Sequence, residues 1–370
     1  MNVIFGASTV GKFVLDICEE KEIKIHYFCD NNPDKMGTIF HEIPVISLQE
    51  IKEKDLYRSD PLLFFISVVD IQDIVSQLEK EGLKRWISCA NMLSHIYHPL
   101  IYNMILSHDN YMNKDKTYLR GVDIVITERC SLKCKDCSNL MNYYEKPVDY
   151  SPTTVYDGVN QLLSLVDKVG EARIIGGEPF MNKFLGEIVE YLIKQDKVDS
   201  VVIYTNATIL PTKKQIEIFK NKKVIFYVSN YGKLSRKYDQ LIELLNKEDI
   251  NYIIANFKWT DCSKINQNNR SKKDNQKIFD DCCVKNLTTL IGDILYRCPF
   301  FANADQLEAI PIFYDGCVDL NNVTKGEIKK FLLKTKYLSV CDFCNGRSFN
   351  DPEIKANVQI KKPLEYKHYE

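Results

Sequence analysis

The stretch that decides the fold is GVDIVITERCSLKCKDCSN, residues 121–139, in which an apolar strand leads directly into three cysteines. Cys130, Cys134 and Cys137 have the spacing C-x3-C-x2-C. Thiolates are soft ligands that select iron–sulfur clusters or zinc. Three of them on one loop can bind three irons of a [4Fe-4S] cube and leave the fourth iron open to an external chelating molecule. A structural zinc site is the alternative, although such a site prefers four ligands and usually pairs two C-x2-C units.

A second motif, ARIIGGEPF at residues 172–180, places paired glycines at the end of a β-branched strand. Because they lack a Cβ, Gly176 and Gly177 allow backbone amides and carbonyls to approach a ligand closely. The carboxylate of Glu178 suits an ammonium group. Taken alone, the glycine pair would instead favour an ordinary turn.

In order and spacing, these two motifs resemble the radical S-adenosylmethionine (SAM) superfamily. The cluster ligands that this resemblance implies are Cys130, Cys134 and Cys137. The fourth iron would be chelated by the amino and carboxylate groups of SAM. The residues expected to hold the methionine end of SAM lie in the GGEP run: Gly176, Gly177, Glu178 and Pro179. Asp136 departs from the family pattern, which often has an aromatic residue just before the third cysteine.

Strands and helices alternate through residues 115–256, which predicts an α/β fold with a partial (β/α) barrel. The apolar strands VVIYTNAT (201–208) and VIFYVSNYG (224–232) are separated by stretches with apolar residues every three or four positions, the helical period. In such barrels the chemistry lies at the C-terminal ends of the strands. The polar residues at these ends, which are either contacts to SAM or ordinary turn and cap residues, are Thr205, Asn206, Ser229 and Asn230.

A second set of cysteines occupies residues 257–350, where we expect a small α+β domain. Cys341 and Cys344 form a C-x2-C unit followed by Asn-Gly, a tight-turn signal. Together with Cys298 and either Cys282 or Cys283, they supply four thiolates from two separate parts of the sequence. This arrangement resembles the Twitch extension, a shortened SPASM domain, and the resemblance implies an auxiliary, fully cysteine-ligated [4Fe-4S] cluster.

Cys282 is preferred over Cys283 because similar sequences place a cysteine just after an acidic residue. A zinc ribbon with the same ligands is the alternative to the auxiliary cluster. Cys262 and Cys317 are left over, either as core residues, since free cysteine is often buried, or as hydrogen donors to a substrate radical. Residues 351–370 are expected to wrap the surface as a tail.

Residues 1–105 form a different unit, for which we expect a Rossmann-like parallel sheet. NVIFGASTVGKFVLDICEE, residues 2–20, has the pattern of a strand, a glycine turn and a helix. Gly6 and Gly11 match the first and last glycines of the dinucleotide fingerprint. Ser8 replaces the middle glycine, which normally admits the pyrophosphate.

Asp30 ends the second expected strand, where it could accept a ribose hydroxyl. Residues 1–95 resemble the nucleotide-sugar-binding N-terminal domains of bacterial sugar acyltransferases, notably in FCDNNPDKMG (28–37) and IPVISLQEI (43–51). The alternative is a docking or dimerisation domain that keeps this fold without its ligand.

Composition excludes several function classes. The net charge of -1 gives no reason to expect a nucleic-acid partner. The apolar stretch PLLFFISVV, residues 61–69, is about half as long as a membrane span. Thirteen cysteines without a secretion signal indicate a reducing compartment, so we expect a cytoplasmic protein. Residues 109–367 contain no histidine, which rules out histidine-based acid–base chemistry there.

Together the resemblances imply a radical SAM oxidoreductase, served by a one-electron reductant such as flavodoxin or ferredoxin. A reduced cluster would split SAM into methionine and a 5′-deoxyadenosyl radical, which takes hydrogen from a sugar or nucleotide-sugar substrate. The auxiliary cluster would then accept an electron as an alcohol becomes a carbonyl, in surface polysaccharide or glycoside biosynthesis. The alternatives are an epimerase in which a thiol such as Cys317 returns hydrogen, a SPASM-type peptide maturase, and a non-enzymatic, zinc-stabilised binding protein.

Overall fold

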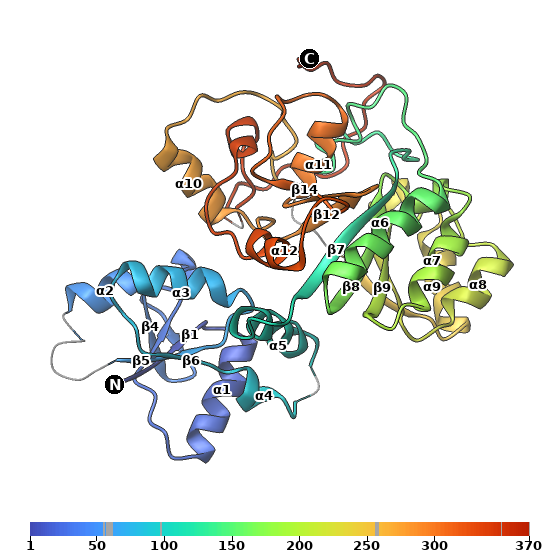
Figure 1. Ribbon diagram of the computed structural model, residues 1–370. Coiled ribbons are helices and arrows are strands. Elements are labelled where there is room, and N and C mark those ends of the chain that lie inside the picture. Colours follow the sequence, from blue (N-terminus) through green and yellow to red (C-terminus); the bar gives the residue numbers. More distant parts are fainter. Residues whose placement is uncertain (55, 57–61, 97, 256–258, 349, 370) are drawn as a thin grey trace. The chain divides into compact units, whose positions relative to one another are not determined.

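A computed structural model of the chain describes residues 1–54, 56, 62–96, 98–255, 259–348 and 350–369. They form two compact units, Met1–Arg120 and Gly121–Glu370 (Figure 1). Each unit contains a sheet with parallel strand pairs and flanking helices, which confirms the expected α/β class. None of the described helices is both long enough and apolar enough to cross a membrane.

The first unit is built on a six-stranded sheet with the order β3-β4-β2-β1-β5-β6. The strands are β1 (Asn2–Phe5), β2 (Tyr27–Cys29), β3 (Ile39–Phe40), β4 (Ile43–Ile46), β5 (Leu63–Ile66) and β6 (Trp86–Ser88). Among the described strands of this sheet, β3 alone pairs antiparallel, with β4. The five parallel strands, numbered along the chain, have the order 3-2-1-4-5. This is the order of doubly wound sheets, which bind ligands where the order reverses, beside β1.

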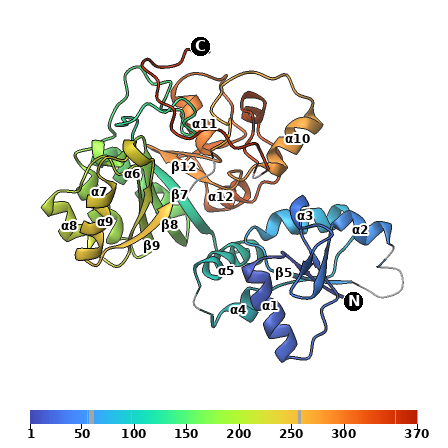
Figure 2. The same ribbon diagram turned by 180° about the vertical axis from the view of Figure 1, so that it is seen from behind.

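Helices cover both faces of this sheet. They are α1 (Thr9–Glu20), α2 (Leu48–Glu53), α3 (Ile71–Lys80), α4 (Ala90–Leu93) and α5 (Pro99–Met112). Side chains alternate along β1, so that Ile4 packs on one face with Val14 of α1 and Met104 of α5. Val3 packs on the other face with Ile74 of α3. Figure 2 shows α1, α4 and α5 on one side of the strands and α2 and α3 on the other. Because α5 belongs to this core, the unit extends beyond the expected boundary at residue 105.

The second unit contains an eight-stranded sheet with the order β11-β10-β9-β8-β7-β12-β13-β14. The strands are β7 (Tyr118–Thr127), β8 (Lys168–Gly176), β9 (Val198–Thr205), β10 (Val224–Ser229), β11 (Asn251–Ala255), β12 (Thr288–Ile291), β13 (Ile294–Tyr296) and β14 (Cys317–Asp319). The pairings from β8 to β11 are parallel, as expected for a strand–helix alternation. The intervening helices are α6 (Pro152–Leu165), α7 (Leu185–Ile193), α8 (Lys213–Phe219) and α9 (Tyr238–Lys247), which lie together along these strands (Figure 1).

The C-terminal cysteine-rich region extends this same sheet. β12 pairs in parallel with β7 and continues as an antiparallel meander through β13 and β14. Its helices are α10 (Lys272–Asp281), α11 (Pro299–Gln306) and α12 (Lys325–Leu332). Short 3-10 helices in the chain lie at Pro33–Lys35, Pro179–Met181, Gly232–Leu234 and Ser339–Phe343.

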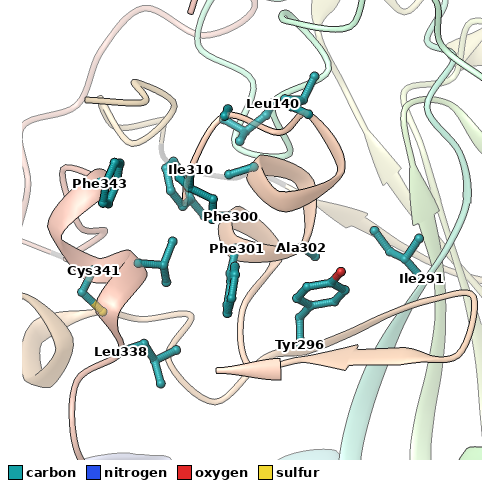
Figure 3. Packing of buried hydrophobic residues seen from close by; sticks show 14 of the residues in the cluster. Leu140, Ile291, Tyr296, Phe300, Phe301, Ala302, Ile310, Leu338, Cys341 and Phe343 are labelled. Carbon is teal, nitrogen blue, oxygen red and sulfur yellow. The ribbon is translucent and has the colours of Figure 1, made fainter. Parts of the chain in front are cut away.

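One hydrophobic cluster joins the first cysteine loop to the C-terminal region. Phe301 of α11 is fully buried in it, together with Leu140 from the cysteine loop and Cys341 from the C-x2-C unit (Figure 3). The sequence starts α11 at this place because Cys298 is its N-cap and Pro299 fills its first turn, where proline costs no hydrogen bond. This core therefore packs residues of the first cysteine loop against the C-terminal cysteine-rich region.

Candidate active site

Two of the three cysteines that follow β7 have side-chain amides directed at their sulfurs. The Asn206 Nδ2 lies 3.6 Å from the Cys130 Sγ. The Gln359 Nε2 donates to the Cys134 Sγ at 3.2 Å. Both sulfurs are free thiols. Hydrogen bonds from N–H groups to cysteine sulfurs are a main means by which proteins tune iron–sulfur clusters.

Backbone N–H groups complete this pattern. Burial raises the pKa of the Cys137 thiol, and hydrogen bonds from the backbone of Met141 and Asn139 oppose that rise. Burial likewise raises the pKa of Cys130, against a hydrogen bond from the Leu132 backbone. Donors of this kind favour the thiolate, and a bound metal would favour it further. The donor set therefore fits an iron–sulfur cluster on this loop.

The glycine pair after β8 packs against the cysteine loop itself. A Cβ on Gly176, whose φ is 141°, would lie 2.0 Å from the carbonyl oxygen of Thr127. A Cβ on Gly177 would lie 2.1 Å from the carbonyl oxygen of Arg129. The Gly177 N–H donates to the Thr127 oxygen at 3.0 Å. The close approach that the glycines allow is thus between the end of β8 and the start of the cysteine loop.

Glu178 is completely buried, and its carboxylate accepts three hydrogen bonds from the protein. The donors are the Thr205 hydroxyl at 2.9 Å, the Asn206 backbone N–H at 2.7 Å and the Phe180 backbone N–H at 3.3 Å. Burial raises the pKa of Glu178 to about 7, although these donors lower it. Glu178 therefore ties the end of β8 to the end of β9 and orients Asn206. Pro179 begins the 3-10 helix that follows.

The Asn206 side chain has one defined orientation. Its Oδ1 accepts from the Thr208 hydroxyl at 2.6 Å and from the Thr208 backbone N–H at 3.1 Å. Its Nδ2 is therefore the atom that faces Cys130, and it also donates to the Ser131 hydroxyl at 3.2 Å. The sequence places Asn206 at a strand end beside SAM, and the structure brings it to the cysteine loop.

Ser229 and Asn230 lie at the end of β10, in a local turn. The Asn230 Oδ1 accepts the Gly232 N–H at 2.9 Å, and the Ser229 carbonyl accepts the Ser235 hydroxyl at 3.1 Å. The next residue, Tyr231, was not expected at the site. Burial, helped by the charges of all three cysteines of the first loop and opposed by a hydrogen bond with Ser229, raises the pKa of Tyr231 to about 12. An aromatic residue directly after a strand end was the only signal for it in the sequence.

A cavity of about 280 Å³ lies beside the first cysteine loop. Its polar lining includes Glu128, Lys133 and Glu145, and Cys130 also lines it. Glu128 accepts from the Val148 N–H at 2.9 Å and from the Tyr150 hydroxyl at 3.0 Å. Burial raises the pKa of Glu128. The cavity is large enough, and polar enough, to admit a small hydrophilic molecule next to the loop.

The second set of cysteines gathers around another cavity. The cysteines that line it are Cys262, Cys282, Cys298, Cys341 and Cys344. Ser138, which follows the last cysteine of the first loop, lines the same cavity, as does Arg347. Cys283 is absent from the lining, so the structure groups Cys282 with the other three expected ligands. The Cys283 backbone N–H donates to the Arg347 carbonyl at 2.7 Å.

N–H groups are also directed at this second set of sulfurs. The Phe301 N–H lies 3.4 Å from the Cys298 Sγ, and the Gly346 N–H lies 3.3 Å from the Cys344 Sγ. The Arg270 guanidinium donates to the carbonyls of Cys341 at 3.1 Å and Cys344 at 2.9 Å, which fixes the C-x2-C turn. Burial raises the pKa of Cys298 well above its usual range.

Within the described residues, no three histidine, cysteine, aspartate or glutamate side chains are arranged to hold a single metal ion. A [4Fe-4S] cube binds each of its thiolates at a different iron, and its ligands therefore stand further apart than those of one zinc ion. Cys317 lies in β14, where its thiol faces the Phe313 carbonyl at 3.2 Å. It lines neither of the two cavities.

In the first unit, the carboxylate expected to accept a ribose hydroxyl makes contacts within the protein. The Asp30 carboxylate accepts from the Ala7 N–H at 2.9 Å, from the Asn32 N–H at 2.9 Å and from the Lys35 ammonium at 3.1 Å. A Cβ on Gly11 would lie 2.0 Å from the Gly6 carbonyl oxygen, so this glycine allows α1 to pack on β1. Asp30 therefore holds the loop after β1 in place.

Several curated proteins are similar to parts of this chain. Molybdenum cofactor biosynthesis protein 1 of Dictyostelium discoideum is 33% identical over 103 residues, which are 27% of this chain and 16% of that protein. GTP 3',8-cyclase of Clostridium acetobutylicum is 28% identical over 95 residues, covering 25% of this chain and 28% of the relative. GTP 3',8-cyclase of Aquifex aeolicus is 26% identical over 156 residues, covering 37% of this chain and 48% of the relative. The chain thus spans less than half the length of these relatives.

Two solved structures are also similar. The crystal structure of BtrN in complex with AdoMet and 2-DOIA has a TM-score of 0.41 and 16% identity, and the match covers 62% of this chain and 94% of BtrN. Streptococcus suis SuiB bound to S-adenosylmethionine has a TM-score of 0.32 and 19% identity, covering 49% of this chain and 45% of SuiB.

Residues 124–254 match the sequence profile of the Radical SAM superfamily. The match begins within β7, includes the cysteine loop and the GGEP run, and ends within β11. It thus covers the strand ends at which Asn206 and Glu178 meet the cysteine loop. This chain therefore carries a radical SAM superfamily domain, whose cofactors are a [4Fe-4S] cluster and SAM.

Proposed function

We propose that this protein is a radical SAM oxidoreductase that oxidises an alcohol of a sugar or nucleotide-sugar substrate to a carbonyl. Cys130, Cys134 and Cys137 would bind the cluster that chelates SAM. The N–H donors directed at all three sulfurs support this assignment. Asn206 would act as a positioning residue, because its amide donates to the Cys130 sulfur. Glu178 would act as a second one, because its carboxylate accepts the backbone N–H of Asn206 and so fixes that residue.

The observation that carries the oxidoreductase proposal is that the first cysteine loop reaches the cavity of the second cysteine set. Ser138 of the first loop lines it together with four expected auxiliary ligands: Cys282, Cys298, Cys341 and Cys344. When bound, the first cluster and SAM supply a carbon radical that can take a hydrogen atom from an unactivated C–H bond. Net oxidation of an alcohol removes one hydrogen atom, one proton and one electron. The second cysteine set would hold the acceptor for that electron close to the first loop.

The cavity beside Cys130 would hold the substrate. Carboxylates of Glu128 and Glu145 can accept hydrogen bonds from the hydroxyl groups of a sugar, and Lys133 can donate to its oxygens. Glu128 would also receive the proton released from an oxidised alcohol. The doubly wound order of the first sheet supports a nucleotide-linked sugar, but Asp30 is engaged within the protein, so any nucleotide would be held by other groups.

Metal content and turnover test the proposal directly. Protein purified without oxygen should contain about eight irons, as two cubes, and negligible zinc. With dithionite and SAM it should release 5′-deoxyadenosine. With a substrate from a panel of nucleotide sugars it should also yield a product two hydrogens lighter than the substrate. GTP should be tested beside this panel, because two relatives are named for it.

Matched cysteine variants separate the two clusters. Cys298→Ala should lose about four irons and the oxidised product while still cleaving SAM, because Cys298 belongs to the auxiliary set alone. Cys317→Ala should keep all irons and full oxidation, since Cys317 lines neither cavity. Loss of activity in Cys317→Ala with iron retained would favour the epimerase alternative. Zinc in place of iron would contradict the proposal. A cytoplasmic location and a flavodoxin or ferredoxin reductant are parts of the same proposal.

A further inference from the structure

We infer that residues 354–369 form a strap across the first cysteine loop, and that Gln359 of this strap is a positioning residue for the Cys134 thiolate. The inference rests on the proposed function, in which Cys134 is a ligand of the SAM-binding cluster. It assigns a role in that site to a segment far from the loop in sequence, outside the residues that match the family profile.

The strap pairs with the cysteine loop as a short antiparallel strand. Cys134 and Gln359 form an antiparallel bridge. The Lys135 N–H donates to the Val358 carbonyl at 2.7 Å, and the Ile360 N–H donates to the Lys133 carbonyl at 2.8 Å. These backbone bonds lie on either side of Cys134, so they fix the position of the loop around this ligand.

Contacts on both sides anchor the strap. Before the bridge, the Ile354 N–H donates to the Trp259 carbonyl at 2.9 Å. After it, the Leu364 N–H donates to the Asn142 carbonyl at 2.9 Å. The Asn142 side chain in turn donates to the Lys135 carbonyl at 2.6 Å, which links this anchor back to the loop.

Aromatic contacts carry the strap on to the second cysteine set. The ring of Tyr366 lies edge-on to Tyr143 of the first loop, with centroids 5.7 Å apart. The ring of Tyr369 lies edge-on to Phe343 in the C-x2-C turn, with centroids 5.8 Å apart. Both tyrosines pack against the hydrophobic cluster shown in Figure 3. The strap therefore contacts both cysteine-bearing regions.

Gln359 makes its contact to Cys134 in one defined orientation. Its Oε1 accepts the Lys133 N–H at 2.8 Å, which identifies the oxygen of the amide. The Nε2 must therefore point the other way, where it donates to the Cys134 Sγ at 3.2 Å and to the Asn357 carbonyl at 2.9 Å. Gln359 is exposed.

The strap also forms part of the proposed substrate cavity. Pro363 lines the cavity beside Cys130, together with Glu128 and Tyr144. One segment thus donates to a cluster ligand and contributes to the wall of the neighbouring cavity. A loose surface tail would do neither.

The hydrogen bond from Gln359 has a definite electrostatic consequence. Reduction adds negative charge to an iron–sulfur cluster, and an N–H donor to a ligand sulfur stabilises the reduced state more than the oxidised state. Removal of the donor should therefore make the first cluster harder to reduce. The auxiliary cluster should be unaffected because Gln359 contacts none of its expected ligands.

The test is the reduction potential of each cluster in Gln359→Leu, measured by EPR during a redox titration without SAM or substrate. We expect about a tenfold lower equilibrium constant for one-electron reduction of the first cluster, equivalent to about 59 mV. The second cluster serves as an internal reference with an unchanged potential. Val358→Leu is the matched control, since the strap uses its backbone carbonyl, and it should leave both potentials unchanged.

A second measurement needs no cluster. In protein without iron, removal of residues 354–370 should speed alkylation of Cys134 severalfold relative to Cys282, as followed by mass spectrometry. Equal potentials in Gln359→Leu and Val358→Leu would overturn the role of Gln359, and unchanged alkylation would overturn the strap. If the full-length protein binds no iron at all, the proposed function fails instead, which its iron content reveals before either test.

Discussion

Burial and hydrogen bonding shift the pKa of the Glu178 carboxyl group in opposite directions. Burial raises its pKa to about 7, and three donors from the ends of β8 and β9 lower it. A folded-state pKa above the usual 4.5 means that the native protein favours the protonated form. The stability contributed by this group is therefore full below pH 4.5 and is lost as the pH rises through about 7.

We accordingly expect Glu178→Gln to remove this loss of stability between pH 4.5 and 7. The amide can keep its oxygen at the Oε2 position for the Asn206 N–H and donate from the Oε1 position to the Thr205 hydroxyl. It gives up only the longer bond from the Phe180 N–H, and it does not titrate. Urea unfolding of iron-free protein at pH 5 and pH 8 checks this, with Trp259 fluorescence in a Trp86→Phe background as the probe. The free energy of unfolding should differ between the two pH values by on the order of 3 kcal/mol in the wild type and by little in the variant. Equal pH dependence in both proteins would show that Glu178 is ionised throughout.

In the first unit, the contribution of His108 to stability changes with pH in the opposite direction. Its Nε2 lies 2.7 Å from the Val68 carbonyl and its Nδ1 lies 2.7 Å from the Ser88 hydroxyl. The carbonyl can only accept, so the proton is on Nε2 and Nδ1 accepts from Ser88. Burial lowers the pKa of His108 to about 4 from its usual 6.5. The stability due to neutral His108 is thus full above pH 6.5 and is lost as the pH falls through about 4.

His108→Gln should flatten this acid sensitivity, because the glutamine amide can donate to Val68 and accept from Ser88 without binding a proton. In the wild type the first unit should lose on the order of 3 kcal/mol between pH 7 and pH 4. Trp86 lies in β6 of this unit, so its fluorescence in a Trp259→Phe background reports the unfolding of that unit. If His108→Gln retained the full acid sensitivity, that result would contradict the assignment of this sensitivity to His108.

At the scale of elements, the decisive contact is between the end of β8 and the cysteine loop. Gly177→Ala would put a Cβ 2.1 Å from the backbone oxygen of Arg129, and backbone cannot move aside as a flexible side chain can. We expect this variant to fold but to lose about four of its eight irons, those of the first cluster. Gly326→Ala in α12 is the control, because its Cβ would meet nothing within 4 Å and alanine favours a helix by about 0.5–1 kcal/mol. Full iron content in Gly177→Ala, measured by metal analysis, would contradict this account.

The same elements show what the sequence could and could not predict. The strand, the cysteine spacing and the glycine pair are local patterns, so their order along the chain and the α/β class followed from them. The role of Gly176 and Gly177 was harder to predict, because a missing Cβ indicates a close approach without naming the partner. Gln359 was not predicted, since it meets Cys134 across 225 residues from a segment without periodicity. Long-range contacts of this kind leave no local signal.

At the scale of the whole molecule, the division into two units separates the proposed cofactor sites from the first sheet. All seven expected cluster ligands lie in Gly121–Glu370: Cys130, Cys134, Cys137, Cys282, Cys298, Cys341 and Cys344. Clusters bound only by the native state stabilise the unit that holds them by mass action. The hydrophobic cluster that includes Cys341 and Leu140 should transmit this effect across the second unit, because it packs both cysteine regions into one core.

Calorimetry of the full chain should therefore show two transitions, of which only one depends on iron. Removing the clusters by anaerobic chelation should lower the unfolding temperature of the second unit by several degrees and leave the other transition in place. The first unit is identified by His108→Gln, which at pH 5 should raise the unfolding temperature of its transition alone, because the variant lacks the acid sensitivity of His108. Gly177→Ala, which is expected to lose only the first cluster, should give an intermediate shift of the iron-dependent transition. If chelation instead lowered both transitions equally, the two units would unfold as one, and the first sheet would share in the stability that the clusters supply.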